Sequence, residues 1–432
     1  MIQMAFEDSE DNWTDALPVC KESGVGFSTN QIYREDGYRQ EDHPFEDRCF
    51  HCKYDESTFV YGIFDGHESS RAANFALQRM AAEILLGQLN GKSTNEEVKE
   101  VLRQAFISVE RGYFDSIGDL LAERTSLKFD IPEELNSYEA YQKFPDLVNK
   151  LNKLNRELAA GTSAIVALVF RNNLYVANVG DSRALLCKTD SNQVLRVVQL
   201  SSHLGNQENT RCLGNYLVKG GYKEFEELAA STSEPIIAEP EIHGGIDLDD
   251  SCRFLLLMSR GLYKSLEEAT GTDQVNKELA LMVVEQFRIQ STLTGVAQAV
   301  VDKVVRIHHD MNMSNSQNSS KSGKREDITL LVRNFNFPLP NALKNPSGQS
   351  VHFNPIVQTA VTSVQEGDFC TSNVSDFNPS TNDTTSTSET SSVNTRPDRN
   401  AKIQPYVDFS EFFENVERRR KNGTLPKDID FG

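Results

Sequence analysis

The sequence predicts an α+β domain followed by a long tail without regular structure. Short apolar runs that stop at turn formers are typical of buried strands, and here they alternate with segments whose apolar residues recur at helical spacing. The clearest strand is Phe254–Met258, which reads Phe-Leu-Leu-Leu-Met and ends before a Ser-Arg-Gly step. After about Phe337 Pro, Asn, Ser and Thr dominate. Such a segment cannot bury enough apolar surface to offset its ordering entropy.

The predicted elements follow one another with turn signals between them. Arg171-Asn172-Asn173 separates two strands and has the chemistry of a hairpin turn. The predicted strands are Ser57–Phe64, Ser163–Phe170, Leu174–Val179, a strand that starts at Ala184, Val194–Leu200, Phe254–Met258 and Ile328–Arg333. The predicted helices are Arg71–Leu89, Val98–Leu121, Glu224–Ala230, Gln274–Gln290 and Thr294–His308, with a partly helical segment over residues 123–157.

Composition narrows the class of protein. The 432 residues carry a net charge of −19, which argues against binding to nucleic acid or to an anionic membrane, because both need a basic face. No apolar run approaches the ~18 residues that a membrane span needs, and the acidic start lacks the regions of a signal peptide. Seven cysteines spread along the chain fit reduced thiols. We therefore expect a cytoplasmic protein.

One cysteine pair has the spacing of half a zinc site. Cys49-Phe50-His51-Cys52 would supply two ligands, but no second Cys-x-x-Cys or His pair follows at a suitable distance. Two ordinary thiols near the start of a strand are the favoured interpretation. The sequence therefore predicts no metal and no cofactor at this position.

Two basic residues follow the strand Phe254–Met258. Residues just past a buried strand lie at the end of its sheet, where side chains meet in a cleft. Arg260 and Lys264 are therefore expected to bring two positive charges to that cleft.

An aromatic segment, Pro405–Val416, returns near the end of the tail. Tyr406, Phe409, Phe413 and Val416 share one face of a helix. The segment either docks as a helix on its own domain or is carried on the tether to another protein's groove. The long tether and the clustered aromatics favour the second interpretation, since aromatic side chains supply binding hot spots.

Five motifs stand in the order found in metal-dependent Ser/Thr phosphatases of the PPM (type 2C) family, which the chain resembles over roughly residues 20–335. They are FDGH at Phe64–His67, GTSAIVALV from Gly161, LYVANVGDSRALL from Leu174, LLLMSRGLY from Leu255 and REDITLLV from Arg325. The resemblance implies an αββα sandwich, in which helices flank two stacked β-sheets.

The resemblance also implies where a phosphatase would hold its metals. The family's metal sites fall on Asp65, the Gly66 carbonyl, Arg260 and Glu326, the catalytic-acid histidine on His67, and a third-metal aspartate on Asp181. In the family a water bound to both metals attacks the phosphate.

The chain departs from the family at these same motifs. Ser259-Arg260-Gly261 replaces Cys/Ser-Asp-Gly, Tyr263-Lys264 replaces Trp-Asp, and Glu326-Asp327 replaces Asp-Asn. The early arginine followed four and five residues later by Glu-Asp is also not found, since Arg34-Glu35-Asp36 has the wrong spacing. We expect Arg260 to pair with Asp65 in place of a metal. Asp65, Gly66, His67, Asp181, Arg260 and Glu326 would then be degenerate remnants of a catalytic site.

One subset of the family lacks phosphatase activity and ends in Pro-Tyr-Val-Asp-Phe-x-x-Phe, a motif that this chain carries at Pro405–Phe412. The resemblance implies an adaptor for the TGF-β-activated MAP kinase kinase kinase that promotes its autophosphorylation in stress and innate immune signalling. It also implies contacts with a stress-activated MAP kinase through the linker and with a BIR domain of an inhibitor-of-apoptosis protein through the globular domain. The kinase-binding residues would be Tyr406, Val407, Phe409, Phe412 and Phe413.

The expected organisation has three parts: a pseudophosphatase domain over residues 1–336, a linker over 337–402 and the kinase-binding motif over 403–421. Between Leu200 and Tyr222 the chain is shorter than the family, so the fold of that segment is left open. Two other functions also stay open. One is a weak metal-dependent Ser/Thr phosphatase that uses the remnants, and the other is a domain that binds phosphopeptides through Arg260 and Lys264.

Overall fold

The computed structural model describes residues 13–34, 38–132, 135–192, 194–201, 210–225, 227–314 and 323–339. The chain divides into two compact units, residues 1–352 and 353–432, and every described residue belongs to the first. Among the described residues, no helix is both long and apolar enough to cross a membrane. The aromatic segment, with Tyr406, Val407, Phe409, Phe412 and Phe413, lies outside the described ranges.

The first sheet is antiparallel and has the β6–β7 hairpin near its centre. Its order is β13 (Glu241–Asp247), β7 (Asn173–Val179), β6 (Gly161–Phe170), β5 (Thr58–His67) and β4 (Arg48–Lys53), and β11 (Leu213–Gly214) also pairs with β6. The predicted hairpin is confirmed. Arg171 and Asn172 have φ values of 49° and 66°, and two positive φ values give a turn whose twist matches that of the strands.

The second sheet is also antiparallel and includes the strand that the sequence predicted most clearly. Its order is β1 (Ser23–Ser28), β16 (Ile328–Asn334), β14 (Cys252–Met258), β8 (Arg183–Thr189) and β9 (Leu195–Gln199). Smaller pairings join β15 (Lys324–Arg325), β2 (Gln31–Tyr33) and β3 (Arg39–Gln40), and β10 (Thr210–Arg211) with β12 (Ile236–Ile237). Side chains from Phe254 to Met258 are fully buried and point alternately into two different cores.

Helices cover the outer face of each sheet, which confirms the αββα sandwich. Residues of α1 (Arg71–Leu85) and α2 (Asn95–Ser116) share one core with the first sheet. Residues of α6 (Arg260–Thr270), α7 (Val275–Phe287) and α8 (Leu293–Ser314) share another with the second. A third core, which includes Tyr61 and Leu257, lies between the sheets. The packing of α8 on β1 is close, since a Cβ on Gly26 would lie 2.5 Å from the backbone of Ala297.

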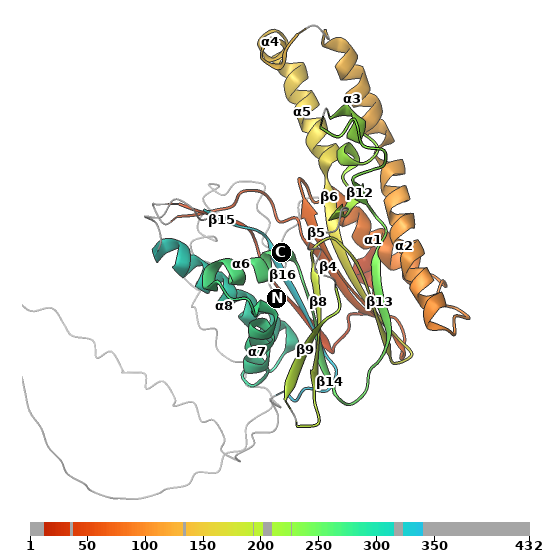
Figure 1. Cartoon of the computed structure of the whole chain (residues 1–432), viewed down its shortest axis with the longest axis vertical. Helices are drawn as coiled ribbons and strands as arrows, with labels where there is room; N and C mark the ends of the chain where they lie inside the picture. Colours follow the sequence, from red (N-terminus) through yellow and green to blue (C-terminus); the bar gives the residue numbers. More distant parts are fainter. Residues whose placement is uncertain are drawn as a thin grey trace, which may run out of the picture. The chain divides into compact units, whose positions relative to one another are not determined.

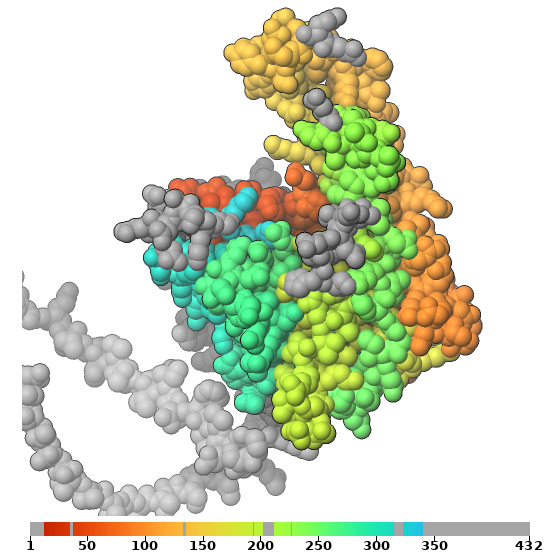
Figure 2. Space-filling model, in the orientation of Figure 1, coloured from red at the N-terminus to blue at the C-terminus, as the bar shows by residue number. Residues whose placement is uncertain are grey.

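A helical arm extends from α2. It consists of α3 (Gly118–Asp130), α4 (Ser137–Lys143) and α5 (Pro145–Ala159), and its outer end stands clear of both sheets (Figures 1 and 2). The predicted single helix Val98–Leu121 is therefore wrong, because α2 ends at Ser116 and α3 begins at Gly118. The break places Ile117, which is fully buried, in the core at the base of the arm.

The segment whose fold the sequence left open is ordered over residues 210–225. It contains β10, β11 and the 3-10 turns η2 (Tyr216–Val218) and η3 (Tyr222–Glu224). Lys219 anchors it: its ammonium is buried and donates to Glu110 of α2 and to the Cys212 carbonyl. The predicted helix Glu224–Ala230 is wrong. Glu224 instead accepts hydrogen bonds from Arg124 and Lys128 of the arm, and turns follow it.

Candidate functional site

The residues that the sequence named as remnants of a phosphatase site meet where both sheets end. Asp65, Gly66 and His67 lie at the end of β5, and Asp181 lies in the turn between β7 and β8. That turn is tight: Gly180 has a φ of 98°, and a Cβ there would lie 2.2 Å from Ser163 Oγ. The Ser163 hydroxyl donates to Asp181 Oδ1 at 3.3 Å, which fixes the carboxylate at the edge of the site.

Arg260 enters the same site as the first residue of α6. Gly261, which follows it, lets the helix approach β16, since a Cβ there would lie 1.9 Å from the Asp327 carbonyl oxygen. The arginine therefore lies directly beside the residues that lead into β16. Its backbone N–H donates to Asp65 Oδ2 at 3.0 Å, so the carboxylate satisfies one of the free N–H groups at the helix N-terminus.

The Arg260 guanidinium lies between two other carboxylates. Its Nη1 donates to Glu326 Oε1 at 3.0 Å, and its Nε lies 3.5 Å from Asp181 Oδ2. Burial lowers the pKa of Arg260, but the charges of Glu326 and Asp181 outweigh it and raise that pKa. The expected pairing of Arg260 with Asp65 is confirmed for the backbone, because Asp65 accepts a hydrogen bond from the Arg260 N–H. The close contacts of the guanidinium are instead with Glu326 and Asp181.

A buried acidic residue that sequence reasoning missed, Asp47, completes the site. Asp47 is 1% exposed; its Oδ2 accepts a hydrogen bond from Thr329 at 2.7 Å, and its Oδ1 has no hydrogen-bond partner among the described residues. Arg48 faces Phe64 in the β4–β5 register, which places Asp47 beside Asp65. Burial raises the pKa of Asp47 to about 7. For Asp65, burial and then the charge of Asp47 raise the pKa well above its ordinary value.

Asp327 binds the backbone of two segments near Asp47. Glu46 precedes Asp47, and its N–H donates to Asp327 Oδ2 at 2.8 Å, while the Asn30 N–H donates to Asp327 Oδ1 at 2.6 Å. Burial raises the pKa of Glu46 to about 7. The sequence signal that could have identified Glu46 and Asp47 is their position just before β4, the strand that pairs with β5. The family's arginine, which precedes Glu-Asp by four and five residues, could not identify them, because Asp42 stands four residues before Glu46 in this chain.

The other two residues named from the sequence do not complete a catalytic arrangement. Lys264 donates to Glu267 on its own helix at 3.2 Å. Its ion pair is therefore with a residue other than Asp47, Asp65, Asp181 or Glu326. His67 packs against Gly161, where a Cβ would lie 2.4 Å from its Nε2. Burial lowers the pKa of His67, which favours the neutral imidazole.

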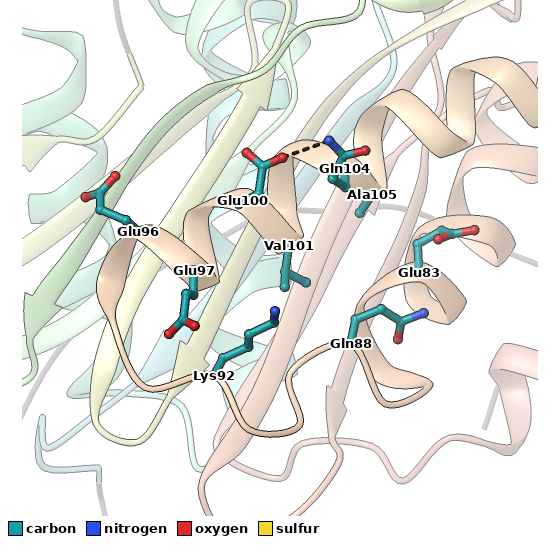
Figure 3. A pocket seen from close by; sticks show the side chains of 9 residues that line it. All are labelled: Glu83, Gln88, Lys92, Glu96, Glu97, Glu100, Val101, Gln104 and Ala105. Carbon is teal, nitrogen blue, oxygen red and sulfur yellow. Dashed lines mark hydrogen bonds between the residues drawn. The ribbon is translucent and has the colours of Figure 1, made fainter.

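Two other features of the domain lie away from this site. Cys49 and Cys52 on β4 belong to different cores, so they face opposite sides of the sheet and cannot ligate one metal. A pocket of about 560 Å³ lies over α1 and α2 and is lined by Gln88 and several glutamates (Figure 3). Glu97 is used there as the capping partner of Thr94, and Glu100 binds Arg103 and Gln104.

The residues present do not fit a divalent metal. Such ions need several free carboxylate or carbonyl oxygens around one point. Here the Arg260 guanidinium already lies between Asp181 and Glu326, and its backbone occupies an oxygen of Asp65. Within the described ranges, no group of three or more His, Cys, Asp or Glu side chains is arranged to hold a metal ion.

Comparison with known proteins finds similarity to protein phosphatase 2C and to a kinase-binding protein. The family model for protein phosphatase 2C matches residues 111–203 and 196–313. A Caenorhabditis elegans protein named "TGF-beta-activated kinase 1 and MAP3K7-binding protein 1" is 26% identical over 345 residues, which cover 74% of this chain and 83% of that protein. "Probable protein phosphatase 2C 2" of Paramecium tetraurelia is 26% identical over 261 residues, which cover 57% and 76%.

Solved structures resemble the chain more distantly. Serine-threonine phosphatase 2C from Toxoplasma gondii is 14% identical with a TM-score of 0.40, and the match covers 73% of this chain and 96% of that one. A C. elegans sex-determining protein is 11% identical with a TM-score of 0.42, covering 73% and 64%.

Proposed function

We propose that the domain, which resembles protein phosphatase 2C, is a catalytically inactive part of an adaptor that binds and activates a protein kinase. The proposal has two parts, an inactive site in the domain and a kinase-binding segment in the tail. Each is supported by separate observations and has its own test.

A single observation carries the first part: the Arg260 guanidinium lies between Asp181 and Glu326. Two unit charges ~4 Å apart interact by roughly 4 kcal/mol at an effective dielectric near 20. A divalent ion at this place would therefore meet a repulsion of about 8 kcal/mol from Arg260. It would also lack the aspartate that the resemblance expects at position 260, so metal-dependent phosphate hydrolysis is disfavoured.

The C. elegans relative supports the second part, because its name describes binding to a TGF-β-activated kinase. We propose that the aromatic segment binds the corresponding MAP kinase kinase kinase, with Tyr406, Val407, Phe409, Phe412 and Phe413 in contact with it. Binding would favour the kinase conformation that autophosphorylates, which is a shift of population rather than chemistry. The expected contacts with a stress-activated MAP kinase and a BIR domain, and the cytoplasmic location, stay predictions of the same proposal.

The test of kinase binding uses the full-length chain and the purified kinase domain. We expect Phe409→Ala with Phe412→Ala to weaken binding at least 30-fold, since a buried aromatic anchor contributes about 2 kcal/mol or more. Ser410→Ala, in the same segment, is the matched control. Titration calorimetry gives the affinity, and autophosphorylation of the kinase gives the activation. Unchanged affinity in the double variant would refute the assignment of the tail.

The alternative function is a weak metal-dependent Ser/Thr phosphatase. Its supporting observation is that Asp47, Asp65, Asp181 and Glu326 all gather at one place. Turnover of a phosphopeptide in millimolar manganese distinguishes the two. We expect none above background, whereas turnover that Asp65→Asn abolishes would establish the phosphatase. A phosphopeptide-binding role is disfavoured because Arg260 and Lys264 both have carboxylate partners.

A further inference from the structure

A second pocket lies at the end of the sandwich opposite the acidic site. It is formed where β5 begins, where the β6–β7 hairpin turns and where β16 ends, whereas the acidic site lies at the other ends of β5 and β16. Its volume is about 540 Å³, which is within the range of small-molecule sites. Apolar side chains of Phe59, Val169, Leu248 and Phe335 form part of its wall.

Arg333 of β16 brings a buried positive charge to this pocket. The residue lines the pocket and is 8% exposed. Neighbouring side chains of a strand point to opposite faces of the sheet. Val332 belongs to the core under the helices and Leu331 to the core between the sheets, so Arg333 points into the space between the sheets.

The charge of Arg333 is incompletely paired. Nη1 donates to the backbone carbonyls of Glu22 at 3.2 Å and Asn334 at 2.8 Å, and it lies 3.9 Å from Glu22 Oε2, whose side chain is half exposed. Nε is buried and has no hydrogen-bond partner among the described residues. A buried guanidinium with an unused N–H is costly, so the pocket lacks an oxygen acceptor.

Aromatic rings flank the same guanidinium. Its central carbon lies 5.1 Å from the centre of the Phe59 ring and 5.3 Å from that of Phe335. Ring faces attract a cation, but a carboxylate makes the stronger, charge-assisted hydrogen bonds with a guanidinium. The pocket therefore combines a buried cation with a flat apolar wall.

The acidic residues that line the pocket are exposed, unlike Arg333. They are Glu56, Asp249 and Asp250. Two of them lie near lysines, since Glu56 accepts a hydrogen bond from Lys53 at 2.8 Å and Asp249 lies 3.6 Å from Lys188. Water and salt screen exposed charges far more than buried ones, so the buried guanidinium decides the sign of the ligand.

We propose that this pocket binds a small aromatic carboxylic acid, with its carboxylate on Arg333 and its ring against Phe59, Phe335 and Leu248. The planar fork of the guanidinium matches the two oxygens of a carboxylate. Burial of the ring against the apolar wall supplies the rest of the affinity. The site shares no residue with the acidic site, so its role is separate from the proposed adaptor function.

Three variants separate the charge from the wall. Arg333→Met removes the charge but keeps a side chain of similar length, and it should fold because Met can pack between the sheets. Leu248→Trp fills the pocket and leaves Arg333 unchanged. Arg196→Met is the matched control, because Arg196 lies on β9 of the same sheet, is mostly exposed and pairs with Asp190.

The experiment titrates the full-length protein with 2-naphthoate, and with 2-naphthamide as a neutral probe of the same shape, by ligand-observed NMR. For the wild type we expect a Kd on the order of 1 mM or below for 2-naphthoate, and binding of 2-naphthamide that is at least about tenfold weaker. Arg333→Met should bind the two probes equally, Leu248→Trp should weaken 2-naphthoate binding, and Arg196→Met should match the wild type.

Thermal unfolding gives a second readout, because a ligand that binds the folded state raises Tm. We expect 2-naphthoate to raise the Tm of the wild type and of Arg196→Met, but not that of Arg333→Met. Far-UV circular dichroism verifies that each variant is folded.

Four results would overturn the proposal. The wild type could show no binding of 2-naphthoate at about 10 mM, or it could bind both probes equally, which would make the apolar wall alone responsible. A folded Arg333→Met could keep its preference for the acid, which would assign the anion to another cation. A folded Leu248→Trp could bind 2-naphthoate as tightly as the wild type, which would place the acid outside this pocket.

Discussion

Replacing Glu110 by glutamine tests the ion pair that holds the 210–225 segment on the domain. The Lys219 ammonium, 1% exposed, donates to Glu110 Oε1 and to the Cys212 carbonyl, and Glu110 Oε2 accepts from the Gly214 N–H at 2.8 Å. Glu110→Gln keeps the shape of the side chain but removes its charge. The buried ammonium then loses its only carboxylate partner among the ion pairs of the described residues.

The expected loss is large because an uncompensated buried charge is left behind. Breaking such a pair from one side costs about 3 kcal/mol or somewhat more. Replacing both partners can be close to neutral, so Glu110→Gln combined with Lys219→Met should recover much of the loss. A stability change of this size lowers Tm by roughly 6 °C in a domain of more than 150 residues.

The assay is urea unfolding monitored by far-UV circular dichroism, with a double-mutant cycle over Glu110 and Lys219. Hydrogen exchange at Gly214 and Leu217 reports whether the segment opens locally before the domain unfolds. The reasoning is refuted if Glu110→Gln changes stability by less than about 1 kcal/mol, or if the double variant is as unstable as the sum of the single ones.

Two further predictions concern the arm and the contact between α8 and β1. Hydrogen bonds from Arg124, with help from Lys128, hold the pKa of Glu224 down at about 2. A carboxyl group whose pKa is lowered by folding stabilises the folded state at pH values above its unfolded pKa, and this stabilisation is lost as the pH falls towards the folded pKa. Proteolysis of the arm should therefore increase as the pH falls from about 4.5 to 2. Glu224→Gln should flatten this pH dependence. Gly26→Ala should destabilise the domain by about 3 kcal/mol, because its Cβ would meet the backbone of Ala297 at 2.5 Å. Gly118→Ala is the control in thermal unfolding, because a Cβ there would have no described atom within 4 Å. Equal Tm values for the two variants would contradict the close packing.

Local patterns predicted most of the sandwich. The strand Phe254–Met258 and the Arg171-Asn172-Asn173 hairpin have signals that depend on neighbouring residues alone, and both are confirmed. The break at Ile117 was missed because the apolar period continues across it. The turns after Glu224 were missed because they depend on Arg124, which lies a hundred residues earlier in the chain.

The site could be predicted less completely than the fold. Motif order pointed to Arg260 and Glu326, which the structure brings together. Nothing local to the sequence links Asp47 to Asp65, because their proximity comes from the pairing of β4 with β5. The contacts of the Arg260 guanidinium with Glu326 and Asp181 were likewise not predicted, since the use of its backbone N–H by Asp65 depends on where α6 begins.

The strand order of the second sheet has a consequence for synthesis of the chain. β1 emerges from the ribosome early, yet its pairing partner is β16, with Ser23 opposite Arg333. At ~5–20 residues per second the intervening chain takes roughly 15 to 60 seconds to translate. During that interval the face of β1 that carries Gly24 and Gly26, and the edge that later pairs with β16, are available to chaperones. The sandwich can close only after β16 has left the exit tunnel.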